Sequence, residues 1–116
     1  MLPPMIVTTT ENIPGTRVTQ TLGQVFGLTV RSRGIGGNIA AGFRGIVGGE
    51  VGSYVKLLED ARRQAVDRMV QNATAMGATA VTMMRFDSSE IGNNMSEIVA
   101  YGTAQVVEPV SGAAAG

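Results

Sequence analysis

The chain has 116 residues, a length typical of one domain. Hydrophobic residues make up 44% and charged residues only 16%, well below the quarter that is usual for a soluble domain. So few charges predict that part of the surface is buried against other copies of the chain, and we expect a homo-oligomer. The alternative is a monomer whose Gly-, Ala- and Thr-rich surface is neutral rather than apolar.

The charges themselves exclude one class of partner. Nine basic and nine acidic residues cancel, and the chain has five aromatic residues and no Trp. Because a phosphate backbone needs a basic stretch, we expect no nucleic-acid partner. Lys56 is the only Lys, and the other basic residues are Arg, which suits fixed pairs at subunit contacts.

Two residue types with versatile chemistry are missing. There is no Cys and no His, which removes disulfides, thiolate chemistry, the most common general base and the soft metal ligands. The first ten residues lack the basic and apolar regions of a signal peptide, and no run approaches the roughly 18 apolar residues of a membrane span. We therefore expect a cytoplasmic protein with no membrane partner and no cofactor.

The first half of the chain predicts strands. Residues 1–4 are an extension, residues 5–10 predict a short strand, and residues 16–32 alternate between apolar and polar side chains over about three strand lengths. A bulge or break is expected at Gly23 or Gly27. One face of this long strand carries the apolar residues that we expect to face the core: Val18, Leu22, Phe26, Leu28 and Val30.

A glycine-rich segment and a long helix follow. Residues 33–49 contain seven glycines and predict a loop and a short, glycine-weakened helix; they match no phosphate-binding motif. Residues 48–76 predict one long helix that ends at Gly77. Its apolar face comprises Val51, Tyr54, Val55, Leu58, Ala65, Val66, Met69, Ala73 and Met76, and its polar face comprises Asp60, Arg63, Gln64, Asp67 and Gln71.

The last part of the chain returns to strands. Residues 78–87 predict a strand, residues 88–96 a loop and residues 97–108 a final strand, while residues 109–116 form an extension. Small apolar residues on one face of the final strand allow a helix to lie close to the sheet: Ile98, Ala100, Gly102, Ala104 and Val106. This order of elements predicts an α+β fold with a mostly antiparallel sheet.

Two groups of residues are candidates for a ligand site or an interface. Arg62 falls near the centre of the helix's apolar stripe, where a buried charge needs a partner. Glu59 is the local candidate, and Glu97 or Glu50 are the distant ones; alternatively, Arg62 reaches solvent at the helix edge. The second group consists of hydroxyl-bearing residues that line a polar pocket or pore, or that simply favour a solvated strand edge: Thr8, Thr9, Thr10, Tyr54 and Tyr101.

Several stretches resemble those of the small bacterial YbjQ-like proteins. They are MIVTTT, IPG, LGQVFGLTVRSR, IVGGE, Tyr54 with KLLEDARRQAVDRM, MGA, RFDSSE and EIVAYGTAQVVE, in collinear order within residues 5–108. The resemblance implies a single domain with a dodecin-subunit-like α+β fold, assembled as a homopentamer that can pair into a decamer. The family is often described as heavy-metal-binding, so the resemblance also implies a metal-binding role. The family has no established active residue that could be assigned to a position in this chain. Thr79 and Gly52 depart from the usual pattern.

Three functions compete at this point. We expect a non-enzymatic ring that acts as a small-ligand-binding or scaffold module, with its site between subunits. A protein that binds a metal ion through oxygen ligands, at residues the sequence leaves unknown, is the alternative. An enzyme is the least favoured, because the usual catalytic side chains are absent.

Overall fold

The computed structural model describes residues 4–32, 51–92 and 95–110, and the side chains of residues 32 and 51–54 are not part of that description. Within these residues the elements are β1 (Ile6–Val7), β2 (Thr16–Ser32), α2 (Val51–Ala75), β3 (Ala80–Ile91) and β4 (Met95–Pro109). The expected α+β class is confirmed. The predicted short helix within residues 33–49 lies outside the described residues.

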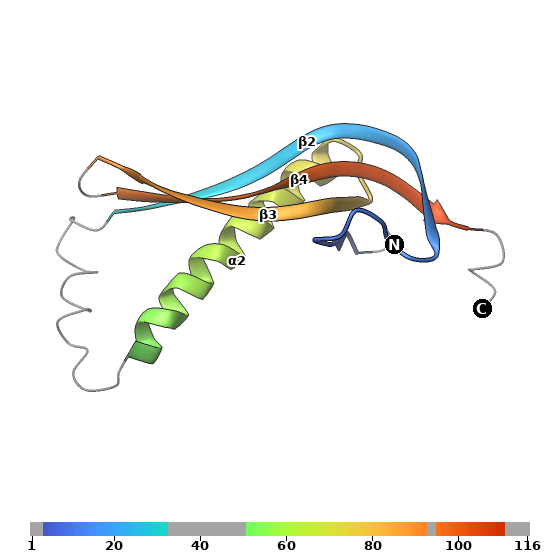
Figure 1. Ribbon diagram of the computed structural model, residues 1–116. Coiled ribbons are helices and arrows are strands. Elements are labelled where there is room, and N and C mark those ends of the chain that lie inside the picture. Colours follow the sequence, from blue (N-terminus) through green and yellow to red (C-terminus); the bar gives the residue numbers. More distant parts are fainter. Residues whose placement is uncertain (1–3, 33–50, 93–94, 111–116) are drawn as a thin grey trace.

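The strands form one mixed sheet in the order β1-β3-β4-β2. β1 pairs in parallel with β3, whereas β4 pairs antiparallel with both β3 and β2. Helix α2 lies on one side of this sheet, and Figure 1 shows it crossing the strands obliquely, with its C-terminal half against the sheet and its N-terminal half directed away. The fold therefore has two layers, and no described element covers the second face of the sheet.

The long strand β2 begins and ends where the sequence predicts, but it presents the opposite face to the helix. Val25, Gly27 and Thr29 are buried, whereas Phe26 and Val30 are exposed. Gly27 explains why this face of β2 meets the helix, because a Cβ atom there would lie 2.1 Å from the backbone nitrogen of Met69 in α2. Only a glycine allows the helix backbone to approach the strand so closely. The expected inward face of β2 is therefore wrong for Phe26 and Val30, whereas Leu22, before the bulge at Gly23, packs against the core as expected.

The expected irregularity in β2 is present at one of the two predicted glycines. The register with β4 shifts between Val18 and Gln20 and again between Thr21 and Gly23. Gly23 has a φ of 117°, a value that other residues rarely adopt. Gly23 thus belongs to a bulge, whereas Gly27 is a contact point with the helix.

Helix α2 buries a narrow line of small side chains and one methionine. Ala61, Ala65, Met69 and Ala73 are spaced four residues apart and are at most 2% exposed. They meet the small face of β4, where Ile98, Ala100 and Ala104 are buried as the sequence predicts. The predicted apolar stripe is only partly right, because Val55, Leu58 and Met76 are exposed. The predicted polar face is exposed along its whole length.

Two strand boundaries differ from expectation. The predicted loop at residues 88–96 is largely a hairpin, since β3 continues to Ile91 and β4 begins at Met95. Pairing across the hairpin, such as Ser88 with Ile98, outweighs the low strand propensity of the serine-rich segment. The predicted strand at residues 5–10 is reduced to Ile6–Val7, because the following threonines fold into a turn.

Candidate functional site

The face of the sheet opposite α2 is apolar at its centre. Cross-strand pairs place Phe26 beside Tyr101 and Leu28 beside Val99, and residues paired across a sheet share a face. The register of β3 and β4 adds Ile91 beside Met95 to the same face. We call this surface the open face and define it by its apolar members: Phe26, Leu28, Val30, Ile91, Met95, Val99 and Tyr101.

Five members of the open face are strongly exposed. Phe26 is 51% exposed, Val30 44%, Tyr101 43%, Met95 39% and Ile91 38%. Large apolar side chains gathered on one surface indicate an interaction site, unlike single ones scattered over a protein. The same face also carries charges of both signs on Arg85, Asp87 and Glu97. The open face thus combines apolar side chains with charges that can select a partner.

A second apolar surface lies on the N-terminal half of α2. Leu57 and Leu58 continue the line of Ala61 and Ala65 by one helical turn, but they are 39% and 46% exposed. Val55 is 46% exposed as well. The helix stripe continues where the sheet no longer lies beneath it, as the oblique course of α2 in Figure 1 makes clear. This uncovered helix turn and the open face lie on opposite sides of the sheet.

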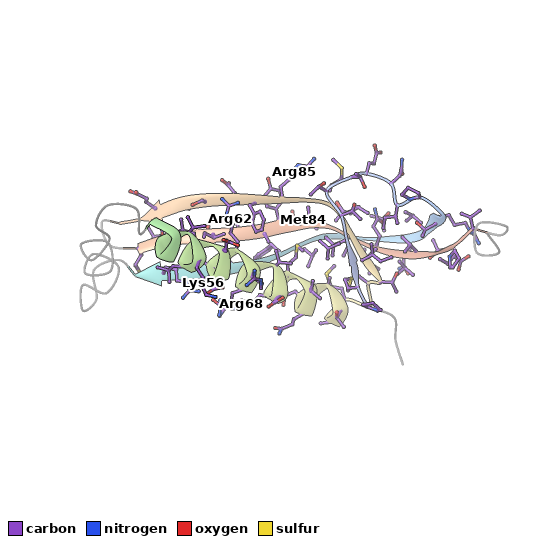
Figure 2. The ribbon with its side chains drawn as sticks, turned by 90° about the horizontal axis from the view of Figure 1, so that it is seen from below. Lys56, Arg62, Arg68, Met84 and Arg85 are labelled. Atoms are coloured by element: carbon purple, nitrogen blue, oxygen red, sulfur yellow. The ribbon has the colours of Figure 1, made fainter. Side chains whose placement is uncertain are left out.

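Arg62 lies in a cleft between α2 and β3. Its guanidinium carbon is 5.0 Å from the centre of the Phe86 ring, within the range of a cation–π contact. The side chain is exposed, which agrees with the alternative that Arg62 reaches solvent at the helix edge and not with a buried position. Figure 2 shows Arg62 on the β3 side of α2 and Arg68 on the β2 side. Glu97 lies on the open face, across the sheet, and cannot contact Arg62 of the same chain.

The cleft has a volume of about 290 Å³ and mixes apolar with charged walls. Val66 and Phe86 are half-buried, while the charged members are exposed. Arg63 forms an ion pair with Asp60 at 3.2 Å. The residues lining the cleft are Glu59, Arg62, Arg63, Val66 and Phe86.

The three threonines near the N-terminus form a turn that holds β3. The Thr8 and Thr10 hydroxyls are 2.9 Å apart, and the Thr8 hydroxyl donates to the Thr10 carbonyl. The backbone carbonyls of all three then accept hydrogen bonds from β3: Met84 N to Thr8, Met83 N to Thr10, and an Arg85 guanidinium nitrogen to Thr9. The Thr8 and Thr10 hydroxyls and the three carbonyls thus form hydrogen bonds within the chain. In the described residues they attach the N-terminal turn to β3.

The predicted site residues therefore separate into three places. Glu97 and Tyr101 lie together on the open face, Arg62 lies in the cleft on the helix side, and Thr8, Thr9 and Thr10 lie at the edge of β3. The side chain of Tyr54 and residue Glu50 are outside the described part of the chain. Sequence reasoning missed Phe86 and the exposed Phe26. The alternation of residues 16–32 contains the signal for Phe26, but by itself it favours a core position for that side chain.

Metal donors are sparse in this chain. It contains no Cys and no His, so the thioethers of its seven Met residues are its soft donors. Over the described ranges, no three acidic side chains come close enough together to hold a metal ion.

Membrane insertion by a helix finds no support in the described part of the chain. No helix there is both long and apolar enough to cross a bilayer.

Comparison with known proteins identifies the family. A family model described as "Putative heavy-metal-binding" matches residues 5–108. A UPF0145 protein of Bradyrhizobium sp. is 65% identical over 109 residues, covering 94% of this chain and 98% of that protein. A UPF0145 protein of the archaeon Picrophilus torridus is 58% identical, covering 91% of this chain and 90% of its own, so the family is not confined to bacteria.

A solved structure supports the fold. A protein of unknown function of the DUF74 family from Pediococcus pentosaceus matches with a TM-score of 0.59, covering 90% of this chain and 98% of that one. Its sequence is only 10% identical, so the likeness concerns the fold alone. With the family model spanning nearly the whole chain and close relatives matched end to end, the protein belongs to the YbjQ-like family of UPF0145 proteins.

Proposed function

We propose that the protein is a non-enzymatic, homo-oligomeric module that acts as a scaffold or binds a small ligand. The observation that carries this proposal is the open face, with five strongly exposed apolar side chains on one side of a two-layer fold. A sheet with a second apolar face normally has that face covered. A second copy of the same chain is the partner we propose.

The positions of the two uncovered surfaces favour a ring over a simple dimer. The helix turn around Leu57 and Leu58 and the open face around Phe26 lie on opposite sides of the sheet. If the helix turn of one copy packs on the open face of the next, the contact is head-to-tail, and such contacts form a ring when the rotation from copy to copy closes. The homopentamer implied by the family resemblance, and its pairing into a decamer, are the sizes we propose.

The mass of the native particle tests this proposal. Native mass spectrometry and light scattering of the untagged protein should give a closed oligomer, with a pentamer or decamer as the expected species. Phe26→Ser and Leu58→Ser should each lower the mass to that of smaller species, because each removes one of the two apolar surfaces. Val18→Ser is the matched control, since Val18 is equally exposed at 47% but lies at the far end of β2.

Two outcomes would overturn the proposal. A wild-type particle that stays monomeric at all concentrations removes the oligomer altogether. A closed oligomer that survives both Phe26→Ser and Leu58→Ser unchanged removes the proposed head-to-tail contact. Circular dichroism of each variant shows whether a change in mass comes from lost contacts or from unfolding.

A further inference from the structure

We infer that the cleft between α2 and β3 binds a small organic anion, one that carries a carboxylate on a compact apolar group. This inference rests on the proposed function and specifies its small-ligand part. The two lining groups that matter most are the Arg62 guanidinium and the Phe86 ring, which lie 5.0 Å apart.

Arg62 is a cation without an anionic partner among the described residues. The ion pairs found there join Arg17 to Glu108 and Arg63 to Asp60, and Arg62 takes part in neither. Among the described residues, Arg62 contacts the face of the Phe86 ring. Glu59 lines the same cleft one turn earlier, yet it does not pair with Arg62. The guanidinium thus retains N–H donors for a ligand.

The geometry suits a planar anion. A guanidinium that stacks on an aromatic ring keeps its in-plane N–H groups available, and these match a carboxylate with two parallel hydrogen bonds. Because Phe86 already restrains the side chain, less conformational entropy is lost when a ligand binds. The half-buried walls of Val66 and Phe86 provide an apolar surface beside the charge. The cleft is shallow and largely open to solvent, and its volume of about 290 Å³ lets one face of a ring-sized group lie against these walls.

The other charges of the cleft refine the ligand class. Arg63 and Asp60 form an ion pair whose net charge is close to zero, so it has little effect on a charged ligand. Glu59 is a fixed negative charge and opposes an anion, so a ligand with one carboxylate is favoured over a dianion. Removal of the Glu59 charge should therefore strengthen binding.

Benzoate is the probe, with benzamide as its uncharged counterpart. Saturation-transfer NMR on the full chain in its native assembly reports ligand binding irrespective of particle size. We expect benzoate to bind with a Kd of about 1 mM, the range for a fragment of this size, and benzamide to bind at least about tenfold more weakly. Methyl-labelled valine should show a shift at Val66 when benzoate is added.

Variants locate the site. Arg62→Gln should weaken benzoate binding about tenfold, whereas Arg62→Lys, which keeps the charge but loses the planar fork, should retain part of it. Glu59→Gln should bind benzoate a few-fold more tightly, an effect that unfolding cannot produce. The matched control is Arg63→Gln, in the same cleft and with the same change of charge, which should alter the Kd by less than about threefold.

The inference is overturned by equal binding of benzoate and benzamide, by unchanged affinity in Arg62→Gln, or by an equal loss in Arg63→Gln. These results are independent of particle mass. If the protein forms a ring that does not bind benzoate, this inference fails and the proposed assembly stands. If the protein is a monomer that binds benzoate, the proposed assembly fails and the ligand site stands.

Discussion

Arg68 of α2 donates a hydrogen bond of 2.7 Å from its guanidinium to the backbone carbonyl of Leu28, at the outer edge of β2. One helical turn later, the Asn72 amide donates to the Phe26 carbonyl at 2.8 Å. β2 is the last strand of the sheet, so these carbonyls have no strand partner among the described residues. Free strand edges invite pairing with other chains, and two helix side chains here occupy part of that edge.

Removing these edge contacts should cost stability. We expect Arg68→Met and Asn72→Ala each to lower the free energy of unfolding by about 1 kcal/mol, the net value of one such hydrogen bond. Methionine keeps most of the apolar stem of Arg68, so the stability lost in Arg68→Met reports mainly on the hydrogen bond. Urea titration provides the measurement, and Gln71→Ala, on the exposed face of the same helix, is the control. If the two variants lose no more free energy of unfolding than the control, then water forms equally good hydrogen bonds to the edge carbonyls.

The boundaries of the main elements are readable from the sequence because local patterns determine them. Residues 16–32 alternate with interruptions at Gln20 and Gln24, and β2 has the same bounds. The helix period of residues 48–76 persists without a proline, and α2 ends at Ala75, just before Gly77 with its φ of 91°. Turn chemistry and periodicity act over a few residues, so a single sequence contains the information for them.

The packing faces cannot be read in the same way. Both faces of β2 carry residues suited to a strand, and alternation alone favours the bulkier face, with Phe26 and Val30, for the core. The close approach of Met69 to Gly27 depends on the relative position of two distant segments, which periodicity does not report. Periodicity leaves two positions open for Arg62 for a related reason. The buried line runs through Ala61 and Ala65 and leaves Arg62 at the helix edge, which is the second of those two positions. The candidate site is thus only partly predictable.

Gly27 tests this account of the helix–sheet contact. A Cβ atom there would lie 2.1 Å from Met69 N and 2.5 Å from Ala65 O, and backbone atoms cannot move aside as a flexible side chain can. We expect Gly27→Ala to lower the free energy of unfolding by about 3 kcal/mol or to prevent folding. Gly92→Ala is the comparison, because Gly92 has a φ of 64° but a Cβ atom there would meet nothing within 4 Å. Its cost should be only about 1 kcal/mol. Similar costs at the two positions would argue against the close contact.

Thr29 offers a stabilising substitution. Its side chain is 2% exposed at the interface of sheet and helix, and its hydroxyl has no hydrogen-bond partner among the described residues. We expect Thr29→Val, which keeps the shape and removes the hydroxyl, to raise the free energy of unfolding by about 1 kcal/mol.

Thr82 provides the matched opposite case, because it is equally buried but accepts a hydrogen bond from Gln105 at 3.4 Å. Thr82→Val should therefore be destabilising. Thermal and urea unfolding of the two variants under identical conditions measure the difference. A loss of stability in Thr29→Val as large as that in Thr82→Val would mean that the Thr29 hydroxyl does find a partner.

Met83 has a backbone conformation that favours glycine. Its φ is 58°, and it lies where the register of β3 and β4 shifts between Thr82 and Arg85. This bulge directs both Met83 N and Met84 N toward the N-terminal turn, where they donate to Thr10 and Thr8 at 3.1 and 2.9 Å. A non-glycine residue there costs about 1–2 kcal/mol, part of which glycine recovers despite its larger loss of backbone entropy.

We therefore expect Met83→Gly to raise the free energy of unfolding by roughly 0.5 kcal/mol, since the side chain is 41% exposed and contributes little burial. Met84→Gly is the neighbouring control and should lower it by about 2 kcal/mol, because Met84 packs against the core. Urea titration of both variants measures the change in stability. Hydrogen exchange at the amides of residues 83 and 84 shows whether their hydrogen bonds to Thr10 and Thr8 are kept. If Met83→Gly were as destabilising as Met84→Gly, the methionine side chain would be contributing contacts that outweigh the strain of its backbone.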